Sequence, residues 1–167
     1  MRYSIITVSY NSEKTIERTI KSILAQSEKD YEYIIVDGAS KDCTVKLIKQ
    51  YEPLFEGRLR WISEPDKGIY NAMNKGISMA KGDVIGIVNS DDWLETDALI
   101  TISEAINTLR INIKSSFVLT GWMKFHYKDG SAQVIRRTYE QFLSGAKKYD
   151  MYLNHPATWV LSLIPIS

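Results

Sequence analysis

The stretch Ile5–Leu24 reads IITVSYNSEKTIERTIKSIL and joins a short β-branched run to a helical pattern. Ile5–Val8 is typical of a buried parallel strand, and the polar residues 9–12 follow it as a loop. Between Thr15 and Gln26, apolar residues recur at helical spacing with charged residues between them, which predicts a helix that lays one face on a sheet. The stretch is therefore one strand-to-helix unit.

The same unit recurs three more times along the chain. Each further unit starts with an apolar run of strand length and continues into apolar residues spaced by three and four. Strands that alternate with helices indicate an α/β fold with a Rossmann-like, mainly parallel sheet and helices on both faces. The expected strands are Tyr33–Val36, Leu59–Ile62 and Val84–Val88, and the expected helices begin near Val45, Ile69 and Thr96.

Beyond Ile111 the pattern changes. Phe117–Tyr127 is rich in β-branched and aromatic residues, Asp129-Gly130 is a common hairpin turn, and Val134-Ile135 can form the returning strand. We therefore expect a mixed, antiparallel extension at the C-terminal end. No linker or repeat divides the chain, so residues 1–167 are expected to form one domain.

The charge balance argues against nucleic acid as a partner, because 21 Lys and Arg against 20 Asp and Glu leave a formal charge of +1. Cys43 is single, so it forms no internal disulfide, and it fits a reducing compartment. The N-terminus lacks a secretory signal pattern, and we expect a cytoplasmic protein. The apolar run Trp159–Ile166 is too short to cross a bilayer, but a peripheral contact at the inner face of a membrane stays open.

Polar clusters follow three of the expected strands, at residues 9–11, 37–40 and 89–92. The carboxyl ends of parallel strands lie at one rim of a sheet, where such sheets bind ligands. In the last cluster the adjacent carboxylates of Asp91 and Asp92 repel each other, and a divalent cation would relieve that repulsion. Oxygen ligands favour Mg²⁺ or Mn²⁺ over zinc. The alternative is that the pair only opens a turn before the next helix.

The other polar residues at this rim have two interpretations each. The Asp37 carboxylate could accept the imide N–H of a uracil ring, or Asp37-Gly38 could be a simple turn. The Tyr10 ring could lie against a base or pack against the protein. Ser9 and Thr7 could bind the base or cap the following helix.

Four segments together resemble the serial motifs of family 2 glycosyltransferases. This resemblance implies a glycosyltransferase A-type fold that binds a nucleoside diphosphate sugar and transfers the sugar with inversion, in a metal-assisted single displacement. A dinucleotide-dependent oxidoreductase fits less well, because Ser-Tyr-Asn rather than a Gly-rich turn follows the first strand, and a Walker-type phosphate loop is missing. The segments are Ile5–Asn11, Ile35–Asp42, Asp66–Gly76 and Asn89–Leu94.

The resemblance also implies roles for single residues. Asp91 matches a position near the ribose or sugar and Asp92 a position on the metal, expected to be Mn²⁺ or Mg²⁺. Asp66 starts a segment that borders the donor pocket, and Lys67 could meet a phosphate or only lie in a turn that caps the helix. The positions that hold the nucleoside are matched by Thr7, Ser9, Tyr10 and Asp37.

The C-terminal part matches less completely. His155 lies in a stretch that resembles one found after the acceptor region, where it could contact the diphosphate, the metal or the acceptor, or be an ordinary partly buried residue. In the family a general base follows that stretch. This chain ends at Ser167 without such a carboxylate, and Glu140 and Asp150 precede the stretch. We therefore expect a shortened enzyme whose base is absent, with slow transfer.

Two functions are consistent with these motifs. The first is a glycosyltransferase that moves a sugar from a donor, expected to be a UDP-sugar, to a glycan or lipid-linked acceptor. The alternative is a nucleotide-sugar-binding module that lacks the base and the acceptor half. In both, residues 1–110 form the nucleotide-binding part and residues 111–167 a partial acceptor-side region. His126 has the pattern of a strand residue and receives no role.

Overall fold

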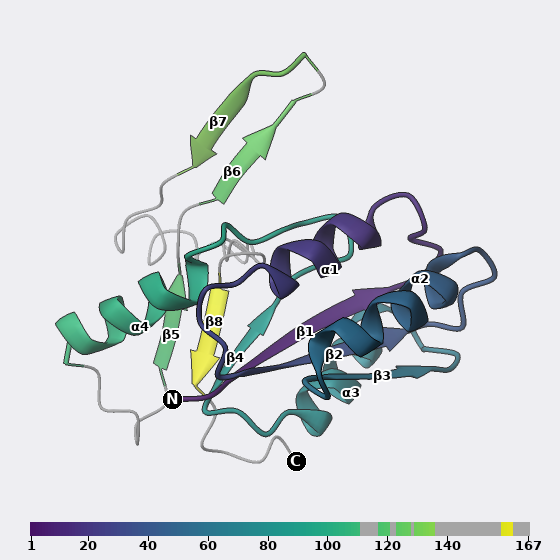
Figure 1. The fold of residues 1–167 in the computed structure, drawn as a ribbon, viewed down its shortest axis with the longest axis horizontal. Helices are drawn as coiled ribbons and strands as arrows, with labels where there is room; N and C mark the ends of the chain where they lie inside the picture. The colour runs from purple at the N-terminus through teal and green to yellow at the C-terminus, as the bar shows by residue number, and fades with distance from the viewer. Residues whose placement is uncertain (111–116, 121–122, 128, 136–157, 162–167) are drawn as a thin grey trace, which may run out of the picture.

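The computed structural model describes residues 1–110, 117–120, 123–127, 129–135 and 158–161. Its helices are α1 (Ile16–Leu24), α2 (Thr44–Tyr51), α3 (Ile69–Met79) and α4 (Ala98–Thr108), with a short 3-10 helix at Glu52–Phe55 (Figure 1). The strands are β1 (Tyr3–Ser9), β2 (Tyr31–Asp37), β3 (Leu59–Ser63), β4 (Val84–Ile87), β5 (Phe117–Thr120), β6 (Met123–His126), β7 (Ala132–Ile135) and β8 (Thr158–Leu161).

The main sheet has the strand order β3-β2-β1-β4-β8-β5. The first four strands run parallel, whereas β8 is antiparallel to both β4 and β5. Strands β6 and β7 form a separate antiparallel hairpin, which extends away from the body of the molecule (Figure 1). The predicted α/β fold with a mainly parallel sheet and an antiparallel C-terminal extension is confirmed.

Alternation along the strands divides the core between the two faces of the sheet. Ile5 and Ile35 point to the face covered by α1, α2 and α4, whereas Ile6 and Val36 point to the face covered by α3. Strands β1 and β2 are therefore buried on both sides along their whole length, as their continuous apolar runs predict. In α4, Leu99, Ile102 and Ile106 enter the core, whereas Ile100 is exposed.

The C-terminal strands divide between the main sheet and the separate hairpin. Within the expected extension, β5 joins the main sheet, whereas β6 pairs with β7 in the hairpin. Strand β8, Thr158–Leu161, inserts between β4 and β5. The pairing of β8 joins residues far apart in the chain, and local periodicity carries no signal for such a partner. Within the described residues, none of the helices is both long and apolar enough to span a bilayer.

Helix α3 approaches the sheet most closely at Gly76. A Cβ atom there would lie 2.5 Å from Cγ2 of Ile6 on β1. We expect Gly76→Val to lower the free energy of unfolding by about 1–3 kcal/mol, because extra methyl groups in a packed core force displacement. Chemical denaturation measures this. Ser78→Val, on the exposed side of the same helix, is the matched control, and equal stability of the two variants would contradict the close approach.

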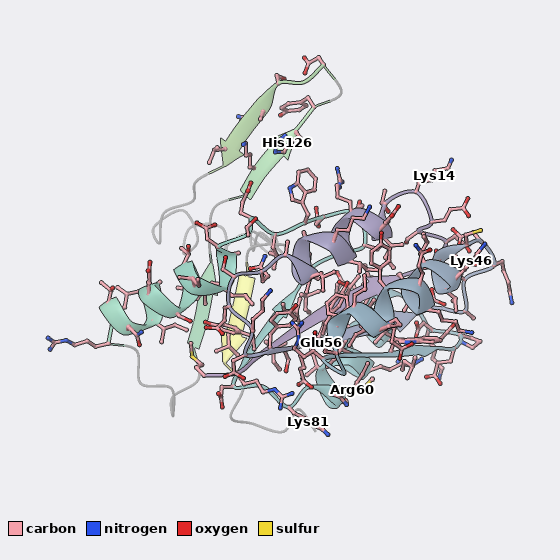
Figure 2. All side chains as sticks on the ribbon, viewed as in Figure 1. Lys14, Lys46, Glu56, Arg60, Lys81 and His126 are labelled. Carbon is pink, nitrogen blue, oxygen red and sulfur yellow. The ribbon has the colours of Figure 1, made fainter. Side chains whose placement is uncertain are left out.

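A buried carboxylate, Glu32, lies near the start of strand β2, and its side chain is 2% exposed. It accepts hydrogen bonds from Ser4 Oγ (2.6 Å), Arg60 Nη2 (2.7 Å) and the Lys81 amide (2.5 Å). Arg60 and Lys81 lie at the same end of the molecule in Figure 2. Burial alone would raise the pKa of Glu32, but these hydrogen bonds and the charge of Arg60 outweigh it and hold the pKa below the usual 4.5.

Glu32 therefore makes stability depend on pH. Its pKa is lower in the folded than in the unfolded chain, so its contribution is present above pH 4.5 and is lost as the pH falls below that value through the folded-state pKa. We expect denaturant titrations at pH 6 and at about pH 3 to show a larger loss of stability for the wild type than for Glu32→Gln. Equal losses would show that this carboxylate contributes nothing.

Candidate functional site

A cleft opens at the carboxyl ends of the parallel strands, where the order of the sheet reverses. The chain passes from β1 to β2 on one side, and β4 pairs with β1 on the other, so the loops after β1 and β4 face each other. The cleft has a volume of about 1140 Å³. It is lined by Val8, Ser9, Tyr10, Asn11, Ser12, Glu13, Lys14, Thr15, Gly38, Asp42, Pro65, Asp66, Gly68, Ile69, Ala72, Asn89, Ser90 and Asp91.

The loops after β1 and β2 hold each other in place. Asn11 has a left-handed backbone with φ of 49°, and its amide donates to Ser40 Oγ at 2.8 Å. The Asn11 side chain accepts from the Lys41 amide at 2.9 Å, and the Ser12 amide donates to Thr44 Oγ1 at 2.8 Å. These contacts give one side of the cleft a defined shape. An Asn in the loop that follows a strand is a signal for such a conformation that sequence reasoning missed.

Asp37 occupies the end of β2 but does not line the cleft. Its side chain is fully buried, and its two carboxylate oxygens accept four hydrogen bonds. The donors are Ser9 Oγ (3.1 Å), Ser63 Oγ (2.6 Å), and the Ser40 amide (2.9 Å) and Oγ (2.5 Å). The acceptor capacity of the carboxylate is therefore used inside the protein. Its expected contact with a base remains a prediction that this arrangement does not favour.

Tyr10, Gly38 and Asp66 form a slot within the cleft. A Cβ atom on Gly38 would lie 3.3 Å from the Tyr10 ring and 3.4 Å from Asp66 Oδ2, so a side chain at this position would narrow the space. The Tyr10 side chain is 65% exposed. Lys75 forms ion pairs with Asp66 and with Glu64, the latter at 2.8 Å, and so fixes the segment that carries Asp66. An exposed ring beside a carboxylate can receive a flat, hydrogen-bonding ligand.

The two acidic residues after β4 differ in position. Asp91 is exposed and lines the cleft, whereas Asp92 is half-buried and does not. Asp92 Oδ2 accepts a hydrogen bond from Asn89 Nδ2 at 3.1 Å. Burial raises the pKa of Asp92, the charge of Asp91 adds to the effect, and the Asn89 hydrogen bond opposes it. The assignment of a metal to Asp92 remains a prediction, but Asp91 has the more direct access to the cleft.

The remaining expected site residues are less central. Thr7 is fully buried and its hydroxyl accepts from Tyr33 at 3.0 Å, while Ser9 lines the cleft. Lys67 is exposed beside the cleft, and its amide donates to Asn71 Oδ1 at 3.2 Å. His155 lies outside the described residues. Among the residues that are described, no three His, Cys, Asp or Glu side chains are grouped closely enough to hold a metal ion by themselves.

The family model described as "Glycosyl transferase family 2" matches residues 4–163. An uncharacterised glycosyltransferase of Mycobacterium tuberculosis is 42% identical over 90 residues, which cover 53% of this chain and 33% of that protein. Chondroitin synthase of Escherichia coli is 38% identical over 96 residues, covering 58% of this chain and 14% of that protein. The chain thus spans a third or less of the length of these two relatives.

Solved structures resemble the fold as well. Staphylococcus aureus TarS 1–349, crystallised in complex with UDP-GlcNAc, matches 72% of this chain and 34% of that chain, with a TM-score of 0.62 and 26% sequence identity. A mannosyltransferase of Pyrobaculum calidifontis matches 63% of this chain and 32% of that chain, with a TM-score of 0.58 and 24% identity, and shows likeness of fold alone. Both comparisons agree with the α/β architecture described above.

Proposed function

Because this chain belongs to glycosyl transferase family 2, we propose that it binds a nucleoside diphosphate sugar in the cleft after β1 and β4 and takes part in transfer of the sugar to an acceptor. The observation that carries the proposal is the meeting of the Tyr10 slot and the Asp91 carboxylate in one cleft. A nucleoside diphosphate has a flat base at one end and two phosphates at the other. The cleft offers a feature suited to each end.

The base is proposed to enter the slot formed by Tyr10, Gly38 and Asp66. Stacking of a base on an aromatic ring contributes about 1–3 kcal/mol, and a carboxylate can accept the imide N–H of uracil. Asp66 Oδ2 and the Tyr10 ring both lie next to Gly38, while the Asp37 oxygens are occupied by three serines. We therefore assign the contact with the base to Asp66. We assign to Asp37 a supporting role, in which its hydrogen bonds to Ser9, Ser40 and Ser63 hold the segments around the slot.

The diphosphate is proposed to lie near Asn89 and Asp91, together with a divalent cation. Mg²⁺ and Mn²⁺ are commonly held by one or two carboxylates plus substrate phosphates, so a complete cage of protein ligands is not required. The donor set fits, because Asp91 lines the cleft and the buried Oδ1 of Asn89 has no hydrogen-bond partner within the described part of the chain. Such a cation would neutralise charge that develops on the departing diphosphate.

The donor is proposed to be a UDP-sugar, with a glycan or lipid-linked acceptor. The likeness to TarS, which was crystallised with UDP-GlcNAc, makes UDP-GlcNAc the first donor to test. Inverting transfer and a cytoplasmic location at the inner face of a membrane belong to the same proposal. His155 is proposed to contact the acceptor or the diphosphate.

The test is release of UDP from UDP-GlcNAc by the purified chain, with Mn²⁺ and with EDTA. We expect Mn²⁺-dependent release, slow when no acceptor is present. Binding without any release would favour the nucleotide-sugar-binding module over the enzyme. Failure of UDP, GDP and dTDP to bind under either condition would overturn both.

A further inference from the structure

The acidic loop after β4, residues 89–95, is fastened to one side of helix α1. Neighbouring side chains of α1 donate to two successive carbonyls of this loop. Arg18 Nη2 donates to the Asp91 carbonyl at 2.7 Å, and Thr19 Oγ1 donates to the Asp92 carbonyl at 2.6 Å. The fastening continues one turn later, where Ser22 Oγ accepts from the Leu94 amide at 3.2 Å. The backbone of the two acidic residues is thus held by α1.

Arg18 also contacts the ring of Trp93, the residue that follows the acidic pair. The guanidinium carbon lies 3.8 Å from the centroid of the Trp93 ring, so the planar group covers the ring while it bonds the Asp91 carbonyl. A lysine has one ammonium and no plane, and it cannot make both contacts in the same way. Arg18 therefore fixes the chain on both sides of Asp92.

Trp93 in turn contacts the hairpin formed by β6 and β7. The ring centroids of Trp93 and His126 are 5.0 Å apart, and Figure 2 shows His126 on the hairpin, above the main body of the molecule. Helix α1 therefore holds the backbone carbonyls of the loop between Asn89 and Trp93. At the end of this loop, Arg18 and His126 contact the Trp93 ring. A loop fastened in this way keeps the direction of its carboxylates.

We propose that Arg18 and Thr19 are positioning residues that keep the Asp91 carboxylate directed into the cleft. The proposal rests on the proposed function, because it assumes that Asp91 meets a cation and a diphosphate there. Neither side chain lines the cleft. Each acts through the backbone of the acidic pair, as outer partners of metal ligands do.

The experiment measures the Mn²⁺-dependent gain in UDP affinity, which is the ratio of the UDP dissociation constant in EDTA to that with Mn²⁺. We expect Arg18→Ala to reduce this gain by about 10-fold, a loss typical for outer partners of a metal site, with no change of the dissociation constant in EDTA. Arg18→Lys should restore only part of the gain. Lys21→Gln, which removes a positive charge from an exposed position of the same helix, should leave it unchanged.

Thr19→Val provides the second variant, because it removes only the hydroxyl from a fully buried side chain of nearly the same shape. It should lower the gain in the same direction as Arg18→Ala. A variant that lowers the melting temperature but keeps the full gain would show a merely structural role and overturn the proposal. A wild-type chain with no gain at all would instead refute the proposed function, so the two failures can be told apart.

Discussion

The Asp91→Asn variant is expected to bind UDP no more tightly with Mn²⁺ than without it. Asp91 is the acidic residue of the pair that lines the cleft, and the substitution removes its charge with little change of shape. Loss of even an outer partner of a metal costs about 10- to 100-fold, so loss of a direct ligand should cost at least as much. Calorimetric titration of UDP, with Mn²⁺ and with EDTA, measures the effect.

Asp92→Asn is the matched comparison, because it makes the same change one residue later. Its carboxylate is half-buried and bonded to Asn89, so we expect a smaller reduction of the Mn²⁺-dependent gain. The sequence interpretation, with the metal on Asp92, predicts the opposite order. Whichever variant abolishes the gain identifies the carboxylate that faces the cation, and a full gain in both variants would contradict a metal site at this loop.

The Asp37→Ala variant is expected to lose stability rather than only affinity. Removal of the carboxylate leaves the Ser9 hydroxyl, the Ser40 amide and hydroxyl and the Ser63 hydroxyl without their acceptor. A buried group without a partner costs about 1–3 kcal/mol, so a loss of roughly 3 kcal/mol is expected, because some of these groups can reach water. Urea denaturation measures the change, and the midpoint should fall clearly.

The Asp66→Asn variant tests whether Asp66 contacts the base while Asp37 only supports the slot. Asp66 lies in the slot beside Tyr10, and its replacement should weaken UDP binding in EDTA while the unfolding midpoint falls much less than in Asp37→Ala. Asp37→Ala with normal stability and no UDP binding would contradict this division. That result would return the contact with the base to Asp37.

The first four strand-to-helix units could be predicted because each is a local pattern. Ile6 and Val36 face α3 while Ile5 and Ile35 face α1 and α2, and this alternation is visible in the order of apolar residues alone. Gly76 is a small residue within a helical pattern, and such a residue permits the close approach of α3 to β1. The place of β8 could not be predicted, because a four-residue strand does not specify a distant partner.

The cleft could be located from the sequence, but the direction of its side chains could not. A polar cluster after a strand predicts a position at the rim, whereas Asp37 turns inward to three serines from separate segments. The support from α1 did leave a signal that was missed. Thr19 is a polar residue on the buried side of an amphipathic helix. Its buried hydroxyl needs a hydrogen-bond partner, which a neighbouring segment of the chain can supply.

Calorimetric titration of the wild-type chain with UDP, in the presence and absence of Mn²⁺, tests the central claim most directly. A cleft that joins the Tyr10 slot to the Asp91 carboxylate should bind UDP with one-to-one stoichiometry, and Mn²⁺ should tighten that binding by about 10-fold or more. Uridine, which lacks the phosphates, should show no effect of the metal. Equal affinity for UDP with Mn²⁺ and with EDTA, or no binding at all, would contradict the account.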